Sequence, residues 1–162
     1  MRKSVITCVA VGLAVVAGGA DAATTTSTFT VNVTITAQCL INSASTLGFG
    51  TQGVLIANVN QTSTIVVQCT VTTTYDIGLD AGTGTGATVG TRKLTGGGAT
   101  INYTLYSDAG RTTVWGNTVS TDTVNATGNG SAQSYTVYGR IPAQTTPAPA
   151  AYSDTITITV TY

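Results

Sequence analysis

Residues 28–37 read TFTVNVTITA and alternate between polar and apolar side chains along their whole length. The apolar face carries Phe29, Val31, Val33, Ile35 and Ala37. Alternation with a period of two is typical of a β-strand that buries one face and exposes the other. The sequence therefore predicts a strand directly before Cys39, and it leaves open whether this strand completes its own domain or that of a neighbouring molecule.

The rest of the chain is also composed for strands and turns. Thr, Val, Ile, Tyr and Gly are abundant, and no helical periodicity is found beyond the first residues. We predict strands over 62–71, 75–80, 99–107, 132–141 and 153–162, a loose bulged strand over 40–52 and a short piece at 113–116. Residues 81–98 are predicted to be a connection with one possible short strand, 119–131 a polar loop, and 142–149 a linker. About seven short antiparallel strands at regular spacing predict an all-β sandwich.

The C-terminal segment repeats the strict alternation. Its apolar face carries Ile156, Ile158, Val160 and Tyr162, with threonines between them. The pattern continues to the last residue, although chain ends usually fray unless they are held. We therefore expect this segment to be buried or paired.

The N-terminus predicts export. Residues 1–22 resemble a secretion signal, with Arg2 and Lys3 before an apolar run and a small-residue cleavage site at its end. Cleavage would remove Cys8, so that Cys39 and Cys69 remain and are expected to form a disulfide in an oxidising compartment. Two free buried thiols are the alternative. A loop of about 30 residues closed in this way stabilises by roughly 3–4 kcal/mol.

Charge and composition exclude several classes of function. The chain has six basic and six acidic residues and no histidine, and loss of Arg2, Lys3 and Asp21 with the signal leaves four against five, a net charge of −1. So weak a charge favours neither nucleic acid nor a membrane surface, and no segment after the signal predicts membrane insertion. Without histidine, the usual general base and the commonest metal ligand are missing. The sequence predicts no enzyme, no catalytic residue, no cofactor and no metal site.

Three motifs suggest chemistry, and each has a simpler interpretation. GTGTGA at 82–87 matches a dinucleotide-binding pattern, but no helix follows it, so a flexible hairpin is favoured. Asp76 and Asp80 lie four apart on a strand, about 13 Å, whereas hydrolase carboxylates lie roughly 5–9.5 Å apart. Trp115 and the tyrosines could stack on sugars, but packing in the core is favoured.

Several longer stretches resemble a known family. INYTLYSDAGRTTVWG at 101–116, YTVYGRIPAQ at 135–144 and YSDTITITVTY at 152–162 together resemble the spore coat protein U domain. That family includes the Csu-type pilins of archaic chaperone–usher pili. The LGFG stretch at 47–50 and the two mature cysteines also fit, so the similarity covers essentially all of the mature chain.

The resemblance implies a fold and a mode of assembly. It implies an incomplete immunoglobulin-like β-sandwich at 38–162, which lacks its last strand, and an N-terminal donor-strand extension at 23–37. A periplasmic chaperone and then, at the outer-membrane usher, the next subunit would supply the missing strand. The implied donor side chains are Phe29, Val31, Val33 and Ile35, and the implied wall of the acceptor groove is the C-terminal strand with Ile156, Ile158, Val160 and Tyr162.

The function implied is that of a structural subunit in a surface pilus of identical or related pilins that serves adhesion and biofilm formation. Two alternatives stay open. One is a spore or cell-surface coat protein of the same family. The other is a monomeric secreted carbohydrate-binding β-sandwich that uses Trp115 and Tyr106.

Overall fold

A computed structural model describes residue 19 and residues 21–162 of the chain. Residues 1–18 and 20, and with them most of the predicted signal, lie outside the described part. The chain divides after Thr34, and Ile35–Tyr162 form a compact unit. Residues 21–38, which we call the tail, contain no regular secondary structure and are exposed throughout. The strand predicted over 28–37 is therefore not formed in the single chain, since a strand needs a neighbour for its backbone hydrogen bonds.

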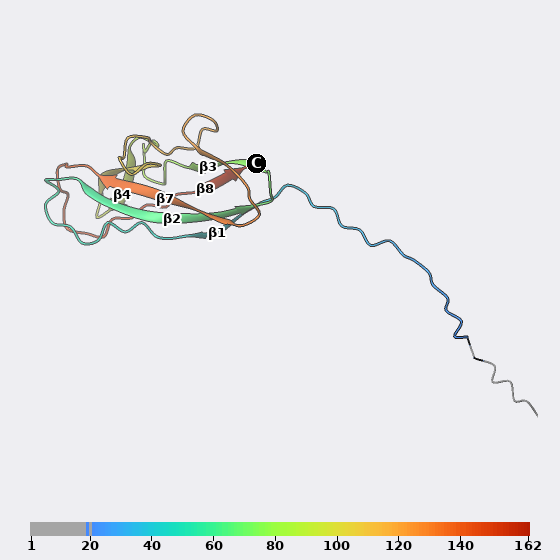
Figure 1. The fold of residues 1–162 in the computed structure, drawn as a ribbon. Helices are drawn as coiled ribbons and strands as arrows, with labels where there is room; N and C mark the ends of the chain where they lie inside the picture. The colour runs from blue at the N-terminus through green and yellow to red at the C-terminus, as the bar shows by residue number, and fades with distance from the viewer. Residues whose placement is uncertain (1–18, 20) are drawn as a thin grey trace, which may run out of the picture. The chain divides into compact units, whose positions relative to one another are not determined.

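Two antiparallel sheets make up the compact unit (Figure 1). The five-stranded sheet has the order β1-β2-β7-β5-β4, with β1 Cys39–Ala44, β2 Val59–Cys69, β7 Ala132–Ile141, β5 Ala99–Tyr106 and β4 Arg92–Gly96. The three-stranded sheet has the order β6-β3-β8, with β6 Val124–Thr127, β3 Thr74–Leu79 and β8 Ile158–Thr161. Every pairing is antiparallel and the described residues contain no helix, which confirms the predicted all-β sandwich.

The boundaries differ from the prediction at four places. The loose strand over 40–52 ends at Ala44, and the piece at 113–116 forms only a single bridge, between Val114 and Tyr106. The polar loop over 119–131 contains β6. The possible short strand within 81–98, by contrast, is confirmed as β4. The C-terminal segment enters the β3 ladder only at Ile158. Before it, Ser153 forms an isolated bridge with Thr95, and the N–H groups of Thr155 and Thr157 donate to the carboxylates of Asp154 and Asp80.

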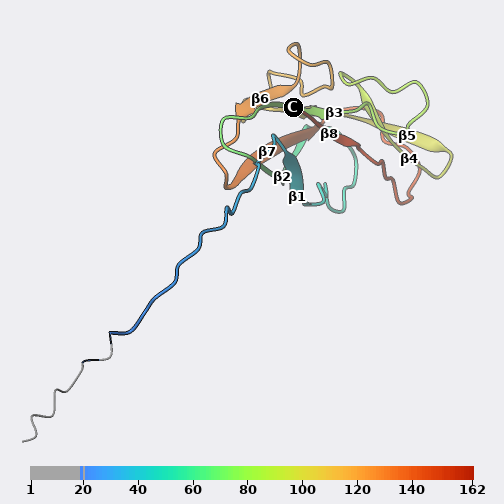
Figure 2. The ribbon, with the colours of Figure 1, turned by 90° about the vertical axis from the view of Figure 1, so that its right-hand side faces the viewer.

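The core lies between the two sheets (Figure 2), where β3 and β8 lie over β7, β2 and β1. Alternate residues of β2 and β3 point into it, among them Val67, Ile77 and Leu79. Trp115 is fully buried, and its Nε1 donates a 2.7 Å hydrogen bond to the carbonyl oxygen of Ile77. The core interpretation of Trp115 is therefore confirmed, and this residue is not available to stack on a sugar.

The disulfide fixes one end of the domain. Cys39 and Cys69 are directly opposite each other in the β1–β2 ladder and are bonded, as predicted. We call this end the cysteine pole, and the end where β2 begins at Val59 the loop pole. β3 follows Cys69 in the chain, so it runs from the cysteine pole to the loop pole. β8 pairs antiparallel with β3 and therefore runs from the loop pole to the cysteine pole. β1 runs the opposite way.

Candidate functional site

The outermost strands of the two sheets have free edges. β1 pairs only with β2, and β8 pairs only with β3, among the residues that the structure describes. Unpaired edges expose backbone N–H and C=O groups that can bind another strand. The other two outermost strands are β4, which Ser153 bridges at Thr95, and β6. Since β1 and β8 come from different sheets and lie next to each other, their two edges mark the place where the sandwich is incomplete.

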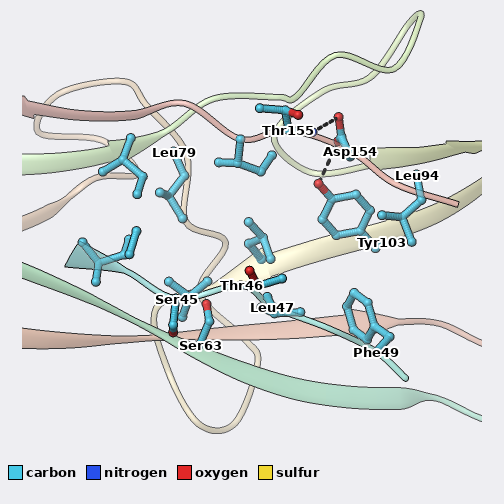
Figure 3. A pocket seen from close by; sticks show the side chains of 16 residues that line it. Ser45, Thr46, Leu47, Phe49, Ser63, Leu79, Leu94, Tyr103, Asp154 and Thr155 are labelled. Carbon is cyan, nitrogen blue, oxygen red and sulfur yellow. Dashed lines mark hydrogen bonds between the residues drawn. The ribbon is translucent and has the colours of Figure 1, made fainter. Parts of the chain in front are cut away.

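A groove of about 310 Å³ opens between the two edges (Figure 3). One wall is the segment 44–49, and the other is the segment 154–158. The bottom consists of core side chains from both sheets, namely Ile65, Leu79, Leu94, Tyr103, Leu105 and Val137. Such a surface can accept apolar side chains from an extended segment.

Asp154 and Tyr103 are the ionisable groups that line the groove, and neither is suited to catalysis. The Tyr103 hydroxyl donates a 2.8 Å hydrogen bond to Oδ2 of Asp154. Burial, together with this bond to a carboxylate, raises the pKa of Tyr103 far above its ordinary value, so the hydroxyl stays protonated. Oδ1 of Asp154 accepts bonds of 2.8 Å from both N and Oγ1 of Thr83. With both carboxylate oxygens occupied, Asp154 is a structural anchor.

The loop with the GTGTGA sequence belongs to this anchor. It forms turns without a helix, as favoured from the sequence, and presents Thr83 to Asp154. Gly82 has φ +79°, and any Cβ there would collide with the carboxylate of Asp154. Gly82 therefore permits the close approach of this loop to Asp154.

Asp80 holds the same wall from the end of β3. Its Oδ1 accepts 3.0 Å hydrogen bonds from the backbone N–H groups of Thr157 and Gly82. Burial alone would raise the pKa of Asp80, but the bonds from Thr157 and Gly82 and the nearby charge of Arg92 outweigh it, so the pKa lies below its ordinary value. Asp76 bonds instead to Thr123 and Asn125, so the two aspartates have separate structural roles.

Arg92 is the residue that sequence reasoning missed. Its side chain is fully buried, and it donates hydrogen bonds of 2.7–2.9 Å to four carbonyl oxygens. These belong to Asp80, Val89, Leu79 and Trp115. The sequence does contain a signal for this role. Arg92 lies two positions before the inward Leu94, and residues two apart on a strand share a face, so Arg92 lies on the buried face of β4.

The predicted donor residues lie in the tail. Phe29, Val31, Val33 and Ile35 are between 75% and 88% exposed. Exposed large apolar side chains usually mark an interaction site when they occur together.

The predicted groove residues divide into three groups. Ile156 and Ile158 line the groove, Val160 packs against the core, and Tyr162 is 59% exposed at the end of the chain. The opposite wall at 44–49 was not predicted as a wall, because its residues read only as a loose strand. Among the described residues no group of three candidate metal ligands occurs, and no helix is long and apolar enough to cross a membrane.

Comparison with known proteins identifies the family. The model of the Spore Coat Protein U domain matches residues 25–159, and the chain belongs to this family. It is 31% identical over 158 residues to "Protein U" of Myxococcus xanthus, covering 88% of each chain. The family resemblance seen in the sequence is thereby confirmed. Membership identifies a structural protein and not an enzyme.

A solved structure shares the fold. It is the complex of the chaperone CsuC with the tip adhesion subunit CsuE, a pre-assembly complex from archaic chaperone-usher Csu pili of Acinetobacter baumannii. The TM-score is 0.58 at 23% identity, over 80% of this chain and 40% of that chain. This chain thus spans less than half of the length of the structure it matches.

Proposed function

We propose that this protein is a structural subunit of a surface pilus that assembles by donor-strand exchange. The observation that carries the proposal is a complementary pair of features in one chain. The compact unit has an apolar groove between two free strand edges, and the tail carries four exposed apolar side chains at alternate positions. The tail of one subunit fills the groove of the next.

The length of the donor segment follows from strand geometry. Alternate residues lie about 6.6 Å apart, so the span from Phe29 to Ile35 is about 20 Å. An inserted strand pairs its backbone with the free edge of β8 and turns one face toward the bottom of the groove. Burial of four such side chains contributes about 6–12 kcal/mol as an upper estimate, from which the entropy of ordering the tail is subtracted.

To fill its own groove, the tail would have to reverse direction within a few residues of β1. Gln38 is already held beside β2, because its carbonyl accepts a 3.0 Å bond from Thr70 N and its N–H donates to Thr70 Oγ1. A tail that lay in its own groove beside β1 would therefore have to turn back within two residues, Thr36 and Ala37. Two-residue reversals require positive φ, which favours Gly, Asn or Asp. Donation to a neighbour needs no such turn and generates an open, head-to-tail fibre.

The same proposal names the partners and the location. An open groove is an aggregation hazard, so a periplasmic chaperone covers it until an outer-membrane usher exchanges it for the next tail. The structure of similar fold is a complex of a chaperone with a pilus subunit, which supports this role for a chaperone. Residues 1–22 act as the export signal, and the fibre serves attachment and biofilm formation.

A coat built from the same polymer is the second candidate. The similarity to Protein U and the family's description favour it. Both candidates use the same groove and tail, so they differ in where the polymer is deposited. A monomeric carbohydrate-binding module is disfavoured because Trp115 is buried.

Deletion of residues 24–37 tests the assembly mechanism. The full chain and the deletion variant are each expressed with the chaperone and the usher. The variant is expected to bind the chaperone and to form no polymer, while the full chain gives a ladder in SDS that collapses on boiling. Normal fibres from the variant would contradict the proposal.

A further inference from the structure

Exposed large apolar side chains of the compact unit gather at its two ends. Beyond Ile35, the structure exposes Leu40, Ile41, Val71 and Tyr162 around the cysteine pole, Val54 and Ile56 at the loop pole, and Val119 in the loop before β6. None of these residues lines the groove. Apolar side chains gathered at opposite ends of a subunit are the arrangement expected for head-to-tail contact.

The loop pole holds its two side chains in a fixed position. Between them, Leu55 is buried, its N–H donates a 2.7 Å bond to Thr146 Oγ1, and its carbonyl accepts a 2.9 Å bond from Gln144 N. Ile56 N also donates to the carbonyl of Val54, which closes a tight turn. Val54 and Ile56 are therefore 74% and 82% exposed on a turn that is anchored to the core.

The cysteine pole has a hollow that can receive apolar side chains. In the single chain it has a volume of about 450 Å³ and is lined by Leu40, Cys69 and Val71, with Ile35, Gln38, Gln68, Thr70 and Gly130. Donation of the tail takes Ile35 out of this lining and leaves the surface of Leu40, Cys69 and Val71. None of these residues is charged. The hollow lies where the tail joins β1, and any subunit that holds this tail must come close to it.

The length of the connection brings the two poles together. All strand pairs in the domain are antiparallel, and a tail that pairs antiparallel with β8 ends with Ile35 toward the loop pole of the acceptor. Three residues separate Ile35 from Cys39, so these two Cα atoms lie at most about 14 Å apart. The cysteine pole of the donor subunit is thus placed beside the loop pole of the acceptor.

We infer that Val54 and Ile56 of the acceptor pack into the hollow beside Leu40 and Val71 of the donor. The inference rests on the proposed function. The contact is small, but the inserted strand holds the two surfaces at an effective concentration on the order of millimolar. Its consequence is mechanical, because it fixes the angle between successive subunits, which the two free linker residues Thr36 and Ala37 do not fix by themselves.

Fibre stiffness tests the contact. Fibres of the full chain are assembled with chaperone and usher, sheared, and measured for persistence length by electron microscopy. Val54→Ser/Ile56→Ser is expected to form fibres whose persistence length falls roughly twofold, since apolar contact no longer restrains the joint. Val119→Ser is the matched control and should leave the persistence length unchanged. Unchanged stiffness in the double variant would overturn the inference and would mean that these side chains face something other than the neighbouring subunit.

A charge pair tests the partner residues directly. Ile56→Lys and Val71→Glu each place a lone charge in the contact, and each is expected to lower the persistence length. The combined variant should recover it, since coupling of this kind is the mark of residues in contact. No recovery would overturn the pairing. If wild-type chains form no SDS-resistant ladder, the proposed function fails; a normal ladder with unaltered stiffness overturns the contact alone.

Discussion

The hydroxyl of Tyr103 donates a 2.8 Å hydrogen bond to Oδ2 of Asp154, and this bond joins the bottom of the groove to one of its walls. Tyr103 belongs to β5 in the larger sheet, whereas Asp154 precedes β8 in the smaller one. The bond therefore ties the two sheets together at the place where the sandwich lacks a strand.

Tyr103→Phe removes this bond and keeps the ring. Hydrogen bonds to charged groups contribute about 1.5–3 kcal/mol, so we expect a loss of stability of that size, reduced by the bonds that Asp154 keeps to Thr83. Denaturant unfolding of the full chain measures it. Tyr106→Phe is the control, because the Tyr106 hydroxyl makes no hydrogen bond among the described residues. Equal stability of the two variants would contradict the role of the bond.

The ionisation of Asp80 determines how the stability of the groove wall at 154–158 depends on pH. Its pKa in the folded protein is below the ordinary value of 3.8. The stabilisation that ionised Asp80 contributes is therefore fully present above pH 3.8. It is lost as the pH falls through the lower pKa that Asp80 has in the folded protein. Unfolding measured as a function of pH should show this acid loss in the wild type and a shallower one in Asp80→Asn. Identical profiles would show that Asp80 does not stabilise the wall.

Arg92→Met tests the buried guanidinium. The substitution keeps an apolar stem but leaves four buried carbonyl oxygens without their donor. We expect a loss of about 3 kcal/mol or more. Lys93→Met is the control, since Lys93 makes a single exposed bond to the Thr85 carbonyl and its loss should be below about 0.5 kcal/mol. Chemical denaturation of both variants checks the difference.

Alternating patterns in the sequence predicted most of the sandwich. The alternation of polar and apolar residues located β2, β3, β5 and β7. The expectation of export led to the correct disulfide between Cys39 and Cys69. β6 escaped prediction because its four residues, VNAT, are too short and polar to stand out from the loop. Its position depends on Asp76, whose carboxylate accepts bonds from Thr123 and Asn125, a contact across 47 and 49 residues of chain.

The groove was only half predictable for the same reason. Ile156 and Ile158 show their role by alternation, so one wall follows from the sequence. The other wall at 44–49 lacks a clear pattern, and Arg92 contradicts the usual exposure of cations. Both depend on tertiary contacts that no local pattern encodes.

Val33→Asp is the sharpest test of the donor strand. Val33 lies on the apolar face of the tail, and an aspartate there would enter the neighbour's groove as an unpaired charge, which is strongly unfavourable. Thr34→Asp is the matched control, since it adds the same charge one residue later on the outward face. With chaperone and usher present, Val33→Asp should abolish the SDS-resistant ladder while Thr34→Asp retains it. Equal ladders from both variants would show that the two faces of the tail are not distinguished, and the tail would then not be inserted as a strand.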